Sequence, residues 1–201
     1  MNTVSVTGLT PLSFLQRGAE VFPDKPAIVY ADRSVTYRGF AAEATRLARA
    51  LQESGVGAGD RVAFLCPNIP EMLVAHFAVP LAGAVLVAIN TRLSAEEVRD
   101  ICDHSGAKLL VVDSEFLPGL APVLAELRTV QEVVAVTDPI GPAGRTRRGP
   151  RRSATPTCSL VARMSRCHGP SMMSWRPSRS TTPSGRPGGR RGCSIRIGVL
   201  T

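Results

Sequence analysis

Residues 59–93, GDRVAFLCPNIPEMLVAHFAVPLAGAVLVAINTRL, decide the fold, because two apolar runs flank one apolar segment of helix length. The runs at 61–66 and 85–89 have the length and composition of buried strands. The segment 70–81 opens on a proline, which is favoured in the first turn of a helix. These residues predict a strand–helix–strand unit, from which parallel sheets are built.

The same alternation continues on both sides of this unit. Downstream, Ser94 and Glu97 form the pattern of a capping box at the start of a helix. The remaining elements are predicted as helices over 13–21 (after a cap at Thr10–Pro11), 38–54, 94–105 and 122–127, and strands over 27–30, 34–37, 107–112 and 132–136. The predicted fold class is α/β, with a parallel-sheet core and flanking helices.

Charge divides the chain at about residue 142. Residues 1–142 contain all sixteen acidic residues and eleven basic ones, whereas residues 143–201 contain thirteen Arg and no Lys, Asp or Glu. A segment with a net charge of +13, much Pro and Gly and few aromatic residues cannot offset its ordering entropy by burial. We therefore expect an incomplete globular domain over 1–142 and a disordered tail over 143–201.

Few side chains in the predicted domain suggest chemistry. Ligands bind at the carboxyl ends of parallel strands, yet the loops at 67–70, 90–93 and 113–116 contain no nucleophile–base pair, glycine-rich phosphate loop or metal-ligand cluster. Asn90 and Arg92 could contact a substrate, but capping of nearby backbone is the favoured interpretation. His76 is interpreted as structural. We predict no catalytic residue and no metal site in the sequence as translated.

The cysteines and the apolar runs argue against a disulfide-rich, metal-binding, membrane-spanning or secreted protein. Five cysteines without a metal-binding spacing argue against a disulfide framework or a metal centre, so they are interpreted as buried or incidental thiols. No apolar run has the roughly 18 residues of a membrane span, and the first eight residues lack the features of a secretory signal. The expected location is cytoplasmic.

Three stretches resemble the opening of the adenylate-forming acyl-CoA synthetases, the AMP-binding enzyme superfamily. They are LTPLSF (9–14) with FPDKPAIVY (22–30) and VTY (35–37), then GDRVAFLCPNIPEMLVAHF (59–77), then VPLAGAVLVAINTRL (79–93). The resemblance covers residues 9–139. The family-motif residues, Asn68, Pro70, Gly83, Asn90 and Arg92, are interpreted as scaffold.

This resemblance implies an ATP-dependent acyl-CoA synthetase, an acid–thiol ligase that forms an acyl-adenylate and then an acyl-CoA thioester. The parent enzyme would use ATP, Mg²⁺ and CoA with a small carboxylic acid, in fatty acid metabolism. The family's Thr/Ser/Gly-rich phosphate loop, which ends in Pro-Lys-Gly, is absent in frame. We therefore expect the chain to be a truncated and inactive fragment.

The tail permits the missing motif in another reading frame. In this shifted frame each codon takes the third base of one tail codon and the first two bases of the next. The bases that encode residues 172–182 can then also encode DELATISINY. The segment from Thr181 to Gly192 then permits most of the phosphate loop, GTTGRPKG, although the 183–184 junction cannot encode the family's usual Ser. These observations predict a frameshift near residue 143.

The alternative is a binding module. A small α/β domain with an arginine-rich arm could bind nucleic acid or another polyanion through counterion release. The absence of lysine from the tail and the hidden motif favour the frameshift.

Overall fold

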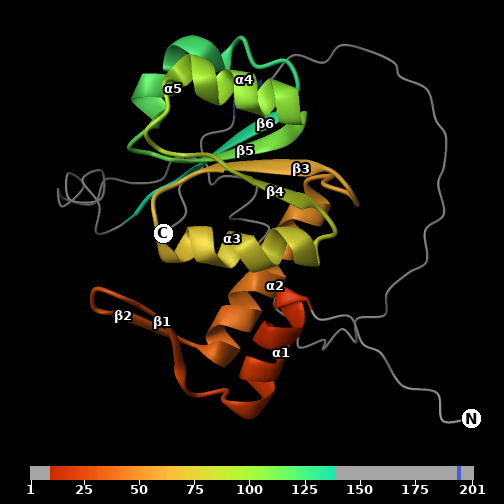
Figure 1. The fold of residues 1–201 in the computed structure, drawn as a ribbon, viewed down its shortest axis with the longest axis vertical. Coiled ribbons are helices and arrows are strands. Elements are labelled where there is room, and N and C mark those ends of the chain that lie inside the picture. Colours follow the sequence, from red (N-terminus) through yellow and green to blue (C-terminus); the bar gives the residue numbers. More distant parts are fainter. Residues whose placement is uncertain (1–9, 139–193, 196–201) are drawn as a thin grey trace, which may run out of the picture.

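The computed structural model describes residues 10–138 and 194–195, and its core is a parallel sheet covered by helices on both faces (Figure 1). The helices are α1 Pro11–Val21, α2 Tyr37–Glu53, α3 Pro70–Leu81, α4 Ala95–Ser105 and α5 Leu117–Leu124. The strands are β1 Pro26–Tyr30, β2 Arg33–Thr36, β3 Arg61–Leu65, β4 Val85–Ala88, β5 Ala107–Asp113, β6 Glu132–Val136 and β7 Ser194–Ile195. The predicted α/β class is confirmed.

The main sheet has the strand order β4-β3-β5-β6-β7, and every neighbouring pair is parallel. Successive side chains of a strand point to opposite faces. On β3, Val62 and Phe64 pack with residues of α2 and α3, whereas Ala63 and Leu65 pack with residues of α4 and α5. Burial on both faces explains why the strands are continuous apolar runs rather than alternating ones.

The helices form a layer on each side of the sheet (Figure 1). α4 and α5 cover one face, α2 and α3 cover the other, and α1 lies outside α2 and α3. The antiparallel hairpin β1–β2 is a separate two-stranded sheet. Arg33 fixes this hairpin to the helices, because its guanidinium lies 3.3 Å from Glu43 Oε1 on α2 and 2.9 Å from Glu71 Oε1 on α3.

The C-terminal end of α4 is joined to the start of β3 by one side chain. Arg61 Nε donates a hydrogen bond to the carbonyl oxygen of Ser105 at 2.6 Å, and Nη2 donates to that of Gly106 at 2.8 Å. Arg61 Nη1 donates to the Gly59 carbonyl at 3.1 Å. Gly106 has φ +67° and ends the helix in the left-handed conformation that glycine favours. A cation at this place also complements the helix dipole.

The turn between α2 and β3 is held by Asp60. Its Oδ2 atom accepts a hydrogen bond from Gly57 N at 2.8 Å and lies 3.1 Å from Lys108 Nζ. The hydrogen bond from Gly57 and the neighbouring Lys108 lower the pKa of Asp60. Asp60 therefore stabilises the turn in its charged form.

Most predicted elements lie where the sequence places them, within one or two residues. The predicted capping box is present, since Ser94 Oγ accepts from Glu97 N and Glu97 Oε2 accepts from Ser94 N. The predicted strand over 34–37 is wrong at its end, because Thr36 is the N-cap of α2 and Tyr37 already belongs to that helix.

The helix predicted over 122–127 was misplaced, since α5 spans Leu117–Leu124. In the structure Pro118 lies in the first turn of this helix, a place that favours proline, and Pro122 lies inside it. The tail predicted over 143–201 lies outside the described residues, apart from the two residues of β7.

Candidate functional site

The carboxyl edge of the sheet is the candidate site, because the strand order reverses there. The chain passes from β3 outward to β4 and then crosses to β5 on the other side of β3. Ligands of open α/β sheets bind at such a switch point, beyond the carboxyl ends of the strands. Cys66 follows β3 at this edge, Asp113 and Ser114 mark the end of β5, and Asp138 follows β6.

Asp113 is the most deeply buried carboxylate of the described chain, with 2% of the residue exposed. Its Oδ1 atom accepts a hydrogen bond from Glu115 N at 2.9 Å. Its Oδ2 atom and the neighbouring Ser114 Oγ are buried, and neither has a hydrogen-bond partner among the described residues. Burial raises the pKa of Asp113, and the charge of Asp138 raises it further.

Tyr30 joins the hairpin to the same edge. Its hydroxyl donates a hydrogen bond to Asp138 Oδ2 at 2.8 Å, across 108 positions of sequence. This bond and burial raise the pKa of Tyr30, so the phenol remains a donor at neutral pH. The contact fixes the hairpin against the end of β6 and provides a partner for Asp138, which is 7% exposed.

The two cysteines of the described chain are buried and unpaired, as interpreted from the sequence. Burial, with a contribution from Asp113, raises the pKa of Cys66 to about 12. Burial raises the pKa of Cys102 to about 11. Because the thiolate is the nucleophile, neither group is suited to covalent catalysis at neutral pH. Cys158, Cys167 and Cys193 lie outside the described residues.

The upstream motif residues lie around α3. Asn68 is exposed in the bend before α3, and Pro70 is the buried first residue of that helix. Gly83, with φ +85°, lies in the turn between α3 and β4, and its carbonyl accepts a hydrogen bond from Gly59 N at 2.9 Å. A Cβ atom on Gly83 would lie 3.6 Å from Ala58 Cα, so two turns meet closely here.

The motif residues after β4 are exposed and make a local contact. Asn90 Oδ1 accepts a hydrogen bond from Arg92 N at 3.0 Å, so the Asn90 side chain binds neighbouring backbone. His76 is exposed on α3, and its Nδ1 donates to the Met72 carbonyl at 2.8 Å. The phosphate loop predicted out of frame under Thr181–Gly192 lies outside the described residues.

The site so assembled is a pair of buried carboxylates with a tyrosine, a serine and an inert thiol. Within residues 10–138, no three His, Cys, Asp or Glu residues are grouped so as to hold a metal ion. The sequence interpretation missed Tyr30, Asp113 and Asp138. The signal for the carboxylates is an aspartate at the end of each of two apolar runs. Asp113 directly follows its run, and Asp138 follows its run after Thr137. The role of Tyr30, in contrast, depends on tertiary packing.

The family model described as AMP-binding enzyme matches residues 15–162, which extends past the boundary predicted at 142. The 4-hydroxybutyrate–CoA ligase 2 of Metallosphaera sedula is 41% identical over 135 residues, which are 67% of this chain and 24% of that protein. The peroxisomal acetate/butyrate–CoA ligase of Arabidopsis thaliana is 44% identical over 110 residues, 55% of this chain and 19% of that one.

A solved structure, the fatty acyl CoA synthetase of Mycobacterium tuberculosis, has the same arrangement. It superposes with a TM-score of 0.59 at 33% identity, over 62% of this chain and 26% of the other. The chain thus spans about a quarter of the length of the proteins that it matches. In the part of the chain that the structure describes, no helix is both long and apolar enough to cross a bilayer.

Proposed function

The chain belongs to the AMP-binding enzyme family, and from this premise we propose that it is the N-terminal part of an AMP-forming acyl-CoA ligase. The main support is identity above 40% to two named CoA ligases, over 135 and 110 residues. The proposed reaction joins a carboxylic acid to ATP as an acyl-adenylate with loss of pyrophosphate. The CoA thiol then displaces AMP.

Three relatives are named for aliphatic acids, and the trans-cinnamate:CoA ligase of Petunia hybrida, 40% identical over 127 residues, is named for an aromatic one. The Metallosphaera enzyme is named for 4-hydroxybutyrate, the Arabidopsis enzyme for acetate and butyrate, and the Mycobacterium enzyme for fatty acids. We therefore propose an aliphatic carboxylic acid as the substrate of the parent enzyme, in agreement with a role in fatty acid metabolism. The cytoplasmic location stays a prediction, because the Arabidopsis relative is named as peroxisomal.

The described residues do not fit ATP with Mg²⁺. One carboxylate oxygen, Asp113 Oδ2, is buried without a partner, whereas Asp138 is engaged by the Tyr30 hydroxyl. A Mg²⁺ site takes carboxylates that face solvent or substrate phosphates, and a phosphate site takes a nest of backbone amides. No step of the reaction is therefore assigned to residues 10–138, and we propose that the 201-residue chain is inactive by itself.

We further propose that the gene contains a frameshift between about codons 140 and 155. The support is the change of composition at residue 143 together with the hidden GTTGRPKG sequence at 181–192. Sequencing the coding DNA from codon 135 to well past the stop tests it. A single insertion or deletion that restores DELATISINYT and an open frame of several hundred codons is expected. A confirmed frame with early stops in the other two contradicts the proposal.

Activity is tested on the two resulting polypeptides. We expect ATP–pyrophosphate exchange with butyrate or a longer aliphatic acid from the restored-frame protein, and none above the no-enzyme control from the 201-residue chain. Exchange by the 201-residue chain would overturn the proposal that it is inactive. Absence of exchange from the restored-frame protein with a panel of acids would overturn the proposed activity. Polyanion binding by the arginine-rich segment stays a separate prediction.

A further inference from the structure

Strand β4 forms one edge of the main sheet. Its single neighbour among the described strands is β3, with which it pairs in parallel over four residues. The amides of Val85 and Ile89 donate to carbonyl oxygens just before and within β3, at 2.8 and 2.9 Å. Because alternate residues of a paired strand direct their backbone groups to opposite sides, the amides and carbonyls of Leu86 and Ala88 point to the free edge.

This edge lacks the features that normally keep sheet edges from pairing. Natural edge strands usually carry a lysine, a proline or a bulge. The hairpin follows this rule, since β1 begins at Pro26 and its register with β2 shifts between Pro26 and Ile28. β4 contains only Val, Leu and Ala, its register with β3 is regular, and Val85 is 52% exposed. β4 is therefore open to pairing with another strand.

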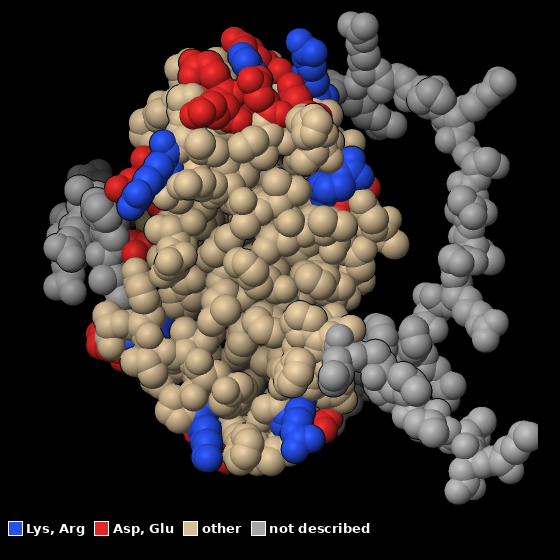
Figure 2. Space-filling model, viewed as in Figure 1, with Lys and Arg blue, Asp and Glu red and all other residues tan. Residues whose placement is uncertain are grey.

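The surroundings of β4 are uncharged as well. Residues 72–91, which include most of α3 and all of β4, contain no Lys, Arg, Asp or Glu. In Figure 2 the middle of the visible face, over α3 and β4, shows none of these residues, whereas acidic side chains gather at the end that carries α4 and α5. A charged partner would find no complement here, whereas a second copy of β4 would meet no like charge.

We propose that β4 pairs in antiparallel fashion with β4 of a second copy of this chain, about a two-fold axis at Val87. This register places Leu86 of each copy opposite Ala88 of the other, and each such pair exchanges both backbone hydrogen bonds. Val87, which packs towards α4 and α5, then faces Val87 of the other copy. A two-fold contact is closed, so it gives a dimer rather than a fibre. The inference does not depend on the proposed ligase activity.

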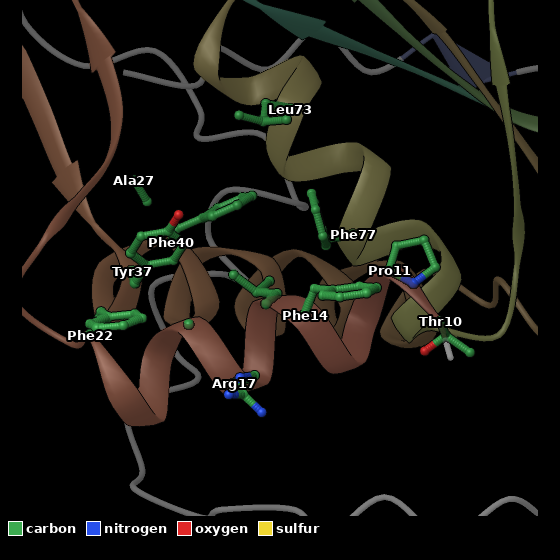
Figure 3. Close-up of a pocket in the computed structure, with 12 residues that line it drawn as sticks. Thr10, Pro11, Phe14, Arg17, Phe22, Ala27, Tyr37, Phe40, Leu73 and Phe77 are labelled. Atoms are coloured by element: carbon green, nitrogen blue, oxygen red, sulfur yellow. The ribbon is translucent and has the colours of Figure 1, made fainter. Parts of the chain in front are cut away.

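The helices offer a competing apolar surface. A hollow of about 610 Å³ lies between α1, α2 and α3 (Figure 3). Phe14 and Phe22 enter it from the α1 side, Phe40 from α2 and Phe77 from α3. Phe14 is 63% exposed and Phe22 is 45% exposed. Side chains line this hollow, whereas β4 presents a row of backbone groups that fixes the register of a partner strand. The experiment therefore tests both surfaces.

The first measurement is sedimentation equilibrium of the 201-residue chain from about 1 to about 300 μM, in about 0.5 M salt to suppress contacts through the arginine-rich segment. We expect a reversible monomer–dimer equilibrium, as for other small interfaces. Ala88→Pro removes an outward amide at an edge, where proline is tolerated, and should raise the dissociation constant more than about tenfold. Phe14→Ser, the matched control, should leave it unchanged. A chain that stays monomeric throughout, or a dimer that Ala88→Pro does not weaken, would overturn the proposal.

Cysteine cross-linking tests the register without the proline variant. In the proposed pairing the Val87 side chains of the two copies lie opposite each other with Cβ atoms about 4.5 Å apart, near the separation that a disulfide needs. Val85→Cys is the matched control, because these positions of the two copies would lie roughly 13 Å apart along the strands. Upon mild oxidation the Val87→Cys chain should cross-link more than about tenfold faster than the Val85→Cys chain. Equal rates contradict the pairing. Mass spectrometry of the digest separates this link from links through the five native cysteines.

Discussion

Arg61 provides a quantitative test of how the α4 end is held to β3. In Arg61→Ala, the carbonyl oxygens of Ser105 and Gly106 lose donors that lie at 2.6 and 2.8 Å. At a partly exposed site we assign about 1 kcal/mol to each of these charge-assisted bonds and about 0.5 kcal/mol to the lost cation at the helix C-terminus. The expected loss in free energy of unfolding is about 2.5 kcal/mol.

The measurement is urea unfolding followed by far-ultraviolet circular dichroism, at constant salt and pH 7. Arg92→Ala is the matched control, because it also removes one guanidinium but from an exposed loop position. We expect a change within about 0.5 kcal/mol for the control, as for most surface substitutions. A loss for Arg61→Ala no larger than that of Arg92→Ala would refute the role assigned to Arg61.

A double-mutant cycle with Gly106 refines the test. A Cβ atom at Gly106 would clash with Arg61 Nη2, and the residue has φ +67°. Gly106→Ala alone should therefore cost about 1 kcal/mol for the strain of alanine in the left-handed conformation, and it should also displace the guanidinium. In the Arg61→Ala background only the cost of backbone strain remains, because there is no guanidinium to displace. Additive losses would show that the two groups do not interact.

Four further predictions concern the carboxyl edge and the turn before β3. Tyr30→Phe should lower the free energy of unfolding by about 1 kcal/mol through the lost hydrogen bond, whereas Tyr37→Phe, compared in the same urea titrations, should have a smaller effect. The pKa of Asp113 is raised by folding, so its contribution to stability is present at acid pH and is lost as pH rises through the folded pKa. Asp113→Asn should therefore gain stability relative to wild type as the pH rises from 4 to 7. Asp60→Asn, which removes a carboxyl of lowered pKa, should be less stable than wild type above pH 4, by a deficit that shrinks as the pH falls below 4. Cys66, with a pKa of about 12, should react with a disulfide reagent at pH 8 only after urea is added, and fast reaction in the native chain would contradict its burial.

The sequence predicts α3 and α4 well because local chemistry sets their ends. Pro70 begins α3 and Gly83 follows it, while the side chain of Ser94 caps α4. Two prolines in α5 give competing local signals, and only packing of Leu120 and Leu124 under the sheet decides between them. Local signals therefore suffice to predict the ends of a helix when the sequence offers only one place for it to begin.

The candidate site was less predictable than the fold. The Tyr30 hydroxyl reaches the carboxylate of Asp138 only because the hairpin is placed against the end of β6, and no local pattern encodes that placement. The burial of Asp113 likewise depends on neighbours that are distant in sequence. Short-range patterns give the strands, whereas the polar contacts at their ends depend on tertiary packing.

The strand order has a consequence for how the chain is made. β4 and β5 each pair with β3, and β6 pairs with β5, so each of these strands joins one that left the ribosome earlier. Because domains fold progressively during synthesis, we expect this sheet to assemble before any later segment is translated. A message interrupted after β6 would then release a folded but unfinished unit, and its exposed phenylalanines are the kind of surface that chaperones and proteases recognise.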